Sequence, residues 1–162
     1  MTGIWGLVAC VVGCLLVGTL GSVVTRPALD GWYARLEKPP FNPPNWLFPP
    51  VWTTLFIFMG VALWLVLRAD PADGQRTLAL VLFGVQLVLN FLWSLFFFGL
   101  KSPGLAMVEL LFFWAALVAT IVLFLPLSTW AGLLFLPYLA WVSFAGILNF
   151  ELWRRNRGAA QA

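Results

Sequence analysis

Long apolar runs alternate with short polar segments along the whole chain. The first run, residues 4–24, carries no charged residue over 21 positions. An α-helix rises 1.5 Å per residue, so about 20 apolar residues are enough to cross the hydrocarbon core of a bilayer. Four later runs are also long enough. The pattern therefore predicts an all-α integral membrane protein, a bundle of five transmembrane helices at about residues 4–24, 48–67, 77–100, 104–125 and 129–153.

The composition supports a surface that faces lipid. The chain has 162 residues, of which 62% are hydrophobic and 9% are charged, whereas about 25% of the residues of a soluble domain are charged. This length suits a single domain, residues 1–162. The chain has no histidine, which excludes a histidine triad and a histidine metal site. We expect no metal site and no nucleic-acid partner, because the basic residues stand at the ends of apolar runs rather than in a stripe.

The segment between the first two runs, residues 25–47, does not fit a simple apolar helix. From Trp32 to Trp52 at the start of the second run, the chain holds six of its eleven prolines and three of its ten tryptophans. Proline fixes φ and removes a backbone donor, so we expect a rigid extended connection over 39–50, after a short interfacial helix within 30–36. Tryptophan suits either a membrane interface or a flat ligand. The segment is therefore either a structured lid over a pocket or an interfacial loop anchored by its aromatic residues.

Helical spacing places two amides and two aromatic rings on one face of the third span. Gln86, Asn90, Trp93 and Phe97 follow one another at intervals of three or four residues. An amide inside a membrane is costly unless it is hydrogen-bonded, so this stripe should face protein or a cavity. For Gln86, a bond between helices and a ligand contact are equally compatible with the pattern. For Asn90, the pattern favours the pocket.

Small residues recur every fourth position in the first span. Such a strip lets two membrane helices approach closely, and we interpret most of it as packing. Ser22 is the exception, because it lies nearest to the proline-rich segment. The strip consists of Gly6, Cys10, Cys14, Gly18 and Ser22.

Two residues interrupt the apolar pattern of the last two spans. Glu109 lies about one turn inside the fourth span, and an ionisable residue in a span is a functional candidate by default. Because it is near the end of the span, we expect it to form a structural pair with Lys101 instead. Pro137 should bend the fifth span.

Three residues from different spans are predicted to meet. In an antiparallel bundle, Trp52, Asn90 and Trp141 can point into one cavity beneath the proline-rich segment. An apolar, aromatic-walled cavity with a few polar groups is typical of a small-molecule site. A flat conjugated ligand could stack on the indole faces, while the Asn90 amide and the tryptophan N–H groups orient it.

Motifs for catalysis are nearly absent. The chain has no paired carboxylates on one helix face and no phosphate-binding loop. A coupled transporter usually has charges within the membrane or repeated halves, and five spans do not divide into repeats. The residues thus favour a binding protein without an obligatory cofactor. The alternative that the aromatic stripes only pack the helices remains open.

The distribution of basic residues predicts the orientation in the membrane. Five spans place the two termini on opposite sides. Seven Lys and Arg residues lie on the side of the carboxyl terminus, and only Arg68 and Arg76 lie on the other. The positive-inside rule then places the amino terminus outside and the carboxyl terminus in the cytoplasm. The basic loops and the short flexible tail, residues 154–162, indicate a bacterial inner membrane.

Tryptophan, proline and aromatic motifs recur in a fixed order from Gly21 to Trp153. Taken together, they make the chain resemble the TspO/MBR family, the family of translocator protein, tryptophan-rich sensory protein and the peripheral-type benzodiazepine receptor. The motifs are Trp32-Tyr33, Lys38-Pro39, Asn42-Pro43-Pro44-x-Trp46, Pro50-Val51-Trp52-Thr53, Leu89-Asn90-Phe91-x-Trp93, Phe97-Phe98-Gly99, Pro137-Tyr138-Leu139-x-Trp141 and Leu148-Asn149-Phe150.

The resemblance implies a five-helix bundle, often a homodimer, that binds porphyrins such as protoporphyrin IX and haem, isoquinoline-type ligands and, in animal relatives, cholesterol. It implies a sensor or carrier that regulates tetrapyrrole-linked or stress responses. Alternatives are porphyrin transport, or a weak photochemical breakdown of porphyrin at Trp52 and Trp141. Ala115 and Ala119 are candidates for a helix–helix contact in a dimer. The resemblance carries ligand-binding roles onto Ser22, Tyr33, Trp46, Phe48, Trp52, Asn90, Trp93, Phe112, Trp141, Ala145 and Leu148.

The chain departs from the family pattern at one place. The cholesterol motif proposed at the carboxyl end of the family needs a tyrosine, and this chain has Phe150 there, beside Glu151. The strict pattern fails, which argues against high-affinity cholesterol binding.

Overall fold

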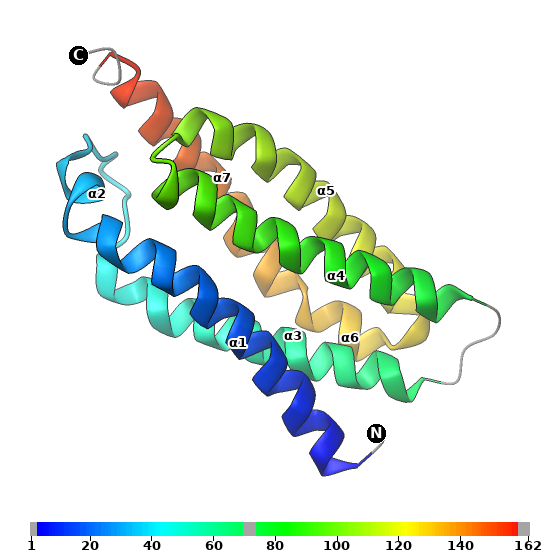
Figure 1. Ribbon diagram of the computed structural model, residues 1–162. Helices are drawn as coiled ribbons and strands as arrows, with labels where there is room; N and C mark the ends of the chain where they lie inside the picture. The colour runs from blue at the N-terminus through cyan, green and yellow to red at the C-terminus, as the bar shows by residue number, and fades with distance from the viewer. Residues whose placement is uncertain (1–2, 70–73, 159–162) are drawn as a thin grey trace.

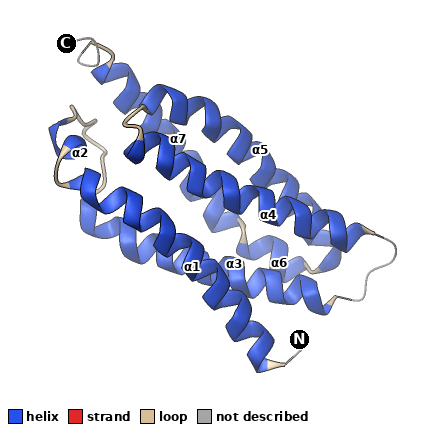
Figure 2. Cartoon of the chain, in the orientation of Figure 1, coloured by secondary structure: helices blue, strands red, loops and turns tan. Residues whose placement is uncertain are grey.

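A computed structural model of the chain describes residues 3–69 and 74–158. Every regular element of these residues is helical (Figure 2). In chain order the elements are α1 (Ile4–Leu29), α2 (Trp32–Arg35), the 3-10 helix η1 (Asn45–Leu47), α3 (Phe48–Arg68), α4 (Gln75–Ser94), the π-helical turn η2 (Leu95–Gly99), α5 (Pro103–Leu127), α6 (Thr129–Leu134) and α7 (Leu136–Asn156).

Five helical segments of the described residues are long and apolar enough to cross a membrane. They confirm the predicted all-α membrane fold, although several bounds differ by a few residues. The first segment runs to Leu29 rather than to residue 24, because its polar last turns continue the helix beyond the apolar run. The segments are Ile4–Leu29, Asn45–Arg68, Gln75–Gly99, Pro103–Leu127 and Thr129–Asn156.

The long helices form one bundle in which α1 packs on α3, α4 packs on α5, and α5 also packs on α7 (Figure 1). The two ends of the chain lie at opposite ends of the bundle, as five spans require. The short helix α2 lies at the same end as the carboxyl-terminal end of α7. The proline-rich segment and the last turns of α7 are therefore on the same side of the membrane.

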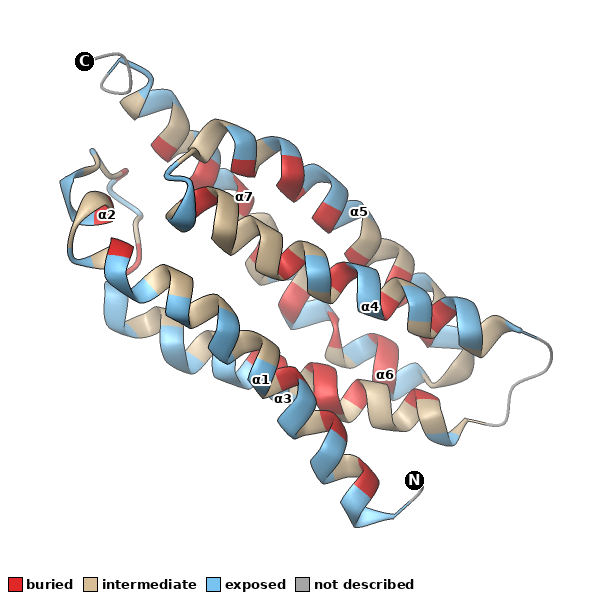
Figure 3. Ribbon diagram, viewed as in Figure 1, coloured by how far each residue is buried: buried red, intermediate tan, exposed pale blue. Residues whose placement is uncertain are grey.

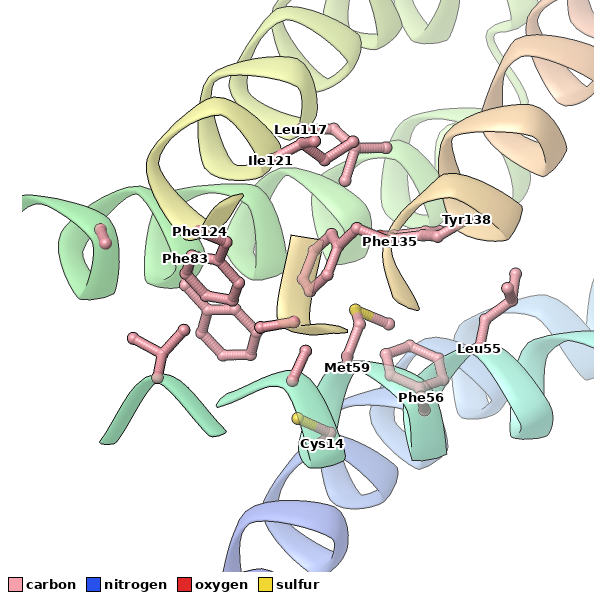
Figure 4. Packing of buried hydrophobic residues seen from close by; sticks show 14 of the residues in the cluster. Cys14, Leu55, Phe56, Met59, Phe83, Leu117, Ile121, Phe124, Phe135 and Tyr138 are labelled. Carbon is pink, nitrogen blue, oxygen red and sulfur yellow. The ribbon is translucent and has the colours of Figure 1, made fainter. Parts of the chain in front are cut away.

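A dense aromatic core fills the half of the bundle that is remote from α2. The rings of Phe83 and Phe124 stack with their centroids 6.0 Å apart, and Phe135 meets Phe124 edge-on at 5.3 Å (Figure 4). All three side chains are buried. Exposed residues cover the outer faces of the helices, where the bundle meets lipid (Figure 3). The half of the bundle beneath α2 contains a smaller buried cluster and the site described below.

The strip of small residues brings α1 and α3 together, as predicted. Cys10 and Cys14 are buried free thiols on α1, and Gly18 lies against the ring of Phe56. A Cβ added at Gly60 of α3 would lie 2.5 Å from the Cα of Val11. Only hydrogen fits at that crossing, so the two backbones are in direct contact.

The proline-rich segment is less extended than predicted. The short helix α2 lies within the expected range, but Asn45–Leu47 forms a 3-10 turn and α3 already begins at Phe48. Pro49 and Pro50 therefore occupy the first turn of a helix. Proline is tolerated there because the first N–H groups of a helix have no partner within the helix.

The predicted pair between Glu109 and Lys101 is wrong. Glu109 is 7% exposed and belongs to the inward face of α5, together with Ala106 and Phe113. No ion pair of the described residues includes it, and neither carboxylate oxygen has a hydrogen-bond partner there. Lys101 lies in the turn before α5 with a φ of 53°. The inward register of Glu109 turns its side chain away from the interface and into the bundle.

Proline has the predicted effect in the fifth span. The helix is interrupted at Phe135, between α6 and α7, and Pro137 lies in the first turn of α7. The predicted flexible tail was to begin at residue 154, but α7 continues to Asn156 and includes Arg154 and Arg155. The tail residues 159–162, and residues 70–73 of the predicted polar connection between the second and third spans, lie outside the described part of the chain.

Candidate functional site

The part of the proline-rich segment that follows α2, residues 36–47, is called the strap. It is attached to α2 by the phenol of Tyr33, which donates a hydrogen bond of 2.9 Å to Asn42 Oδ1. The amide of Asn42 in turn donates to the Pro43 carbonyl at 2.9 Å. Burial raises the pKa of Tyr33 above its ordinary value, and the bond to Asn42 opposes this shift. The phenol therefore keeps its proton at neutral pH and remains a donor to the strap.

A second attachment joins the strap to the last turn of α7. The Glu37 N–H donates to Asn156 Oδ1 at 3.0 Å, and Asn156 Nδ2 donates back to the Glu37 carbonyl at 3.1 Å. One side-chain amide thus pairs with both polar groups of one backbone residue. Arg155 Nη1 adds an ion pair to Glu37 Oε1 at 3.2 Å, and the ring of Phe41 meets Phe144 of α7 at 6.4 Å. The strap is therefore held across the end of the bundle.

An internal space of about 170 Å³ lies at this end of the bundle, between α1, α2, α3, α7 and the end of α4 with η2. Nine of the eleven residues that the sequence predicts as ligand-binding line it. Their ligand-binding role stays a prediction, but the structure brings them to one place. They are Ser22, Tyr33, Phe48, Trp52, Asn90, Trp93, Trp141, Ala145 and Leu148.

The two remaining predicted residues lie elsewhere. Trp46 is 69% exposed and lines a shallow groove on the outside of α3 and α7. Phe112 is 66% exposed and points outward from α5. The inward position on this turn belongs to Phe113, whose ring lies 6.0 Å from Tyr138. One residue is a rotation of about 100° on a helix, enough to move a side chain from the core to lipid.

The two central tryptophans are half-buried and come from two helices. The indole of Trp52 on α3 meets Phe56 at 6.0 Å and Tyr138 at 6.1 Å. The indole of Trp141 on α7 meets Phe48 edge-on at 6.0 Å and Phe144 at 5.6 Å. Each ring is thus held by aromatic neighbours, and both belong to the cavity wall.

A directed chain of hydrogen bonds orients Asn90. Tyr138 donates its hydroxyl proton to Gln86 Oε1 at 3.2 Å, so it must accept the bond of 2.8 Å from Asn90 Nδ2. Gln86 Nε2 contacts the sulfur of Met59 at 3.7 Å. Gln86 of α4 therefore forms hydrogen bonds to neighbouring helices, which is one of its two predicted roles. Asn90 lines the cavity, as the pattern favoured. One N–H of its amide is used inside the protein, and its oxygen and second N–H make no hydrogen bond among the described residues.

Thirteen further cavity residues were not predicted as site residues, among them Arg26, Phe56, Phe144 and Asn149. Phe56 lies one helical turn after Trp52, a spacing visible in the sequence. Arg26 was counted only as a charge that sets orientation. Asn149 Nδ2 donates to the Pro103 carbonyl at 2.8 Å. Its amide position is thereby fixed, which no local pattern could show.

The chemistry of the cavity is that of binding. Its wall is mostly aromatic and aliphatic, with Arg26 as the only charged residue among those that line it. Within residues 3–69 and 74–158, no three His, Cys, Asp or Glu side chains come together in a way that could hold a metal ion. Such a wall suits an apolar ligand with a flat ring, held by stacking and a few polar contacts.

The size of the cavity sets a condition on the ligand. Sites for drug-sized ligands have about 300–1,000 Å³, and a cavity of about 150 Å³ accommodates benzene. The space of about 170 Å³ found here therefore suits one or two aromatic rings. A larger macrocycle can enter only if the strap or the aromatic side chains of α7 move outward.

Comparison with known proteins gives consistent matches over most of the chain. A model of the TspO/MBR family matches residues 10–154. The chain is 45% identical over 150 residues to tryptophan-rich protein TspO of Chlorobaculum tepidum, covering 93% of this chain and 95% of that protein. It is 40% identical over 147 residues to protein CrtK of Rhodobacter capsulatus, with 91% and 90% covered. It is 38% identical over 143 residues to the translocator protein of Bos taurus, with 88% and 85% covered.

Proposed function

This chain belongs to the TspO/MBR family, and on that premise we propose that it is a membrane sensor or carrier that binds tetrapyrroles such as protoporphyrin IX or haem. Isoquinoline-type molecules would occupy the same cavity. The ligand acts as a signal or cargo, and the protein requires no cofactor. The names of its relatives, which include a sensory protein and translocator proteins, agree with this class of function.

One observation carries the proposal. Residues from separate helices that the sequence predicts as ligand-binding line a single apolar cavity, with Trp52 and Trp141 in its wall. Stacking on an aromatic ring contributes about 0.5–1.5 kcal/mol beyond the burial of area. A tetrapyrrole offers a large flat face for such stacking.

The proposal includes the place of the protein in the cell. The chain lies in a bacterial inner membrane with its amino terminus outside, so the strap faces the cytoplasm. Ligand could then be exchanged with the cytoplasmic side after the strap moves.

The test is a titration of protoporphyrin IX into the purified protein in nanodiscs, followed by quenching of tryptophan fluorescence. We expect saturable binding by the parent protein. Replacing both Trp52 and Trp141 by phenylalanine should weaken the affinity about tenfold, because each loss is worth roughly 0.7 kcal/mol. Trp130→Phe is the matched control, since Trp130 is 72% exposed and does not line the cavity.

Three outcomes would count against the proposal. If the double variant binds protoporphyrin IX with the same affinity as the parent, this cavity is not the site. The absence of any saturable binding would favour the alternative in which the aromatic stripes serve only to pack the helices. Quenching that falls equally in the Trp130→Phe control would indicate nonspecific partitioning of the porphyrin into the nanodisc.

A further inference from the structure

The cavity has one cation at its mouth. Arg26 is exposed and lies in the last turn of α1, beside the cavity residues Thr25 and Leu29. It is the only charged side chain among the residues that line the cavity. The rest of the wall offers aromatic rings, aliphatic carbon and a few neutral polar groups. A charge at this one position can select among ligands that fit the apolar space equally well.

The guanidinium of Arg26 has no protein partner in the described part of the chain. The ion pairs found there belong to Arg154 and Arg155. Arg68 and Arg157 lie over tryptophan rings instead. Arg26 makes no side-chain hydrogen bond within residues 3–69 and 74–158, although Asp30 follows one turn later. Its five N–H donors are therefore available to a group that comes from outside the protein.

The cavity wall also contains residues with unused buried polar atoms. Trp93 Nε1 is a donor without a partner, and Asn149 Oδ1 is an acceptor without a partner, among the described residues. The Asn149 amide is oriented by its nitrogen, which donates to the Pro103 carbonyl and leaves the oxygen unpaired. Buried polar groups in native proteins are nearly always hydrogen-bonded. Trp64 Nε1 and both Glu109 oxygens, away from the cavity, are unpaired as well among the described residues. The guanidinium at the mouth, rather than these atoms, therefore points to a ligand.

We propose that Arg26 binds the carboxylate of the ligand, so that the cavity takes flat apolar molecules bearing an acidic group in preference to neutral ones. This inference rests on the proposed function, and for a tetrapyrrole the acidic group is a propionate side chain. The ring system enters the aromatic space, and the carboxylate stays at the mouth, where it keeps its hydration. A guanidinium matches a carboxylate with two parallel hydrogen bonds.

The test combines one change in the ligand with one change in the protein. Protoporphyrin IX and its dimethyl ester are titrated into the parent, Arg26→Gln and Arg35→Gln proteins, in nanodiscs of neutral phosphatidylcholine. Arg35 is the matched control, because it is an exposed arginine at the same end of the bundle that does not line the cavity. We expect the parent and Arg35→Gln to bind the acid about tenfold more tightly than the ester. Arg26→Gln should bind acid and ester equally.

The ester also reports on folding. Its affinity for Arg26→Gln should equal its affinity for the parent, since the ester has no carboxylate to lose. A fall in the affinity for the ester would show that Arg26 supports the structure rather than the ligand, and would overturn the inference. Equal binding of acid and ester by the parent would overturn it too, while leaving the proposed function intact.

An anionic lipid headgroup has the same chemistry as a ligand carboxylate. The titrations are therefore repeated in nanodiscs that contain phosphatidylglycerol. If Arg26 serves the headgroup instead, the parent shows no preference for the acid in either membrane, and the inference is wrong. If neither porphyrin binds the parent at all, the proposed function and this inference fail together.

Discussion

Removing the hydroxyl of Tyr138 tests the polar chain that orients Asn90. Tyr138 is 0% exposed, and its hydroxyl joins Asn90 of α4 at 2.8 Å to Gln86 at 3.2 Å. Tyr138→Phe keeps the ring and its aromatic contacts. It deletes two hydrogen bonds and leaves two amides without their partner.

The expected cost follows from where each amide lies. In soluble proteins an unsatisfied buried polar group costs about 1–3 kcal/mol, whereas hydrogen bonds between membrane helices average about 0.6 kcal/mol. Gln86 is 0% exposed and cannot reach water, so the higher range applies to it. Asn90 borders the cavity and can turn toward it, so the lower value applies. The sum is about 1.6–3.6 kcal/mol of unfolding free energy.

The assay is equilibrium unfolding in mixed detergent micelles, with increasing SDS and a fluorescence readout. Tyr33→Phe is the control, because Tyr33 is the other tyrosine of the chain and its bond to Asn42 lies outside the membrane spans. That variant should lose no more than about 1 kcal/mol. A Tyr138→Phe protein as stable as the parent, or one that loses no more than Tyr33→Phe, would refute the assignment of the chain.

Three further predictions concern the strap, the helix crossing and the buried acid. Asn156→Ala should speed hydrogen exchange of the strap amides about tenfold, because it removes the paired bonds to the strap, which are worth roughly 1.4 kcal/mol together. Arg154→Gln should not change the exchange rate, because Arg154 pairs only with Glu151. Gly60→Ala should cost at least about 1–3 kcal/mol of unfolding free energy, because its Cβ would lie 2.5 Å from the α1 backbone; Gly84→Ala, with no atom within 4 Å, should be neutral or stabilising. Glu109→Gln should leave stability unchanged or raise it, since neither carboxylate oxygen has a partner in the described residues, and a loss above about 2 kcal/mol would show that such a partner exists.

Local rules predicted the spans and the convergence of Trp52, Asn90 and Trp141 on one cavity, whereas other lining residues, such as Tyr33 and Ala145, were implied by the resemblance to the family. The length of an apolar run decides whether it can cross a membrane, and helical spacing put Trp93 on the same face as Asn90. The small residues of α1 likewise marked its packing face. These patterns predict the structure correctly because each depends on a single helix.

The errors arose where one helix gives no sign of which face is inward. The fourth span is apolar on all sides, since its lipid face is as hydrophobic as its core, so nothing in the sequence distinguished Phe112 from Phe113. The inward register of Glu109 was hidden for the same reason.

The course of the strap depends on contacts that are distant in the chain. Asn156 holds Glu37, 119 residues away, and Trp46 lies outside the cavity. No local pattern contains this information. The placement of Arg26 at the cavity mouth likewise depends on the packing of α1 against α3, α4 and η2.

The most direct test of porphyrin binding in this cavity is an experimental structure of the protein with protoporphyrin IX bound. The space of about 170 Å³ is too small for the macrocycle, so the account predicts porphyrin between Trp52 and Trp141, with the strap or the Phe144 side chain displaced outward. Porphyrin bound on the lipid-facing surface, with Trp52, Trp141 and the strap unmoved, would contradict it.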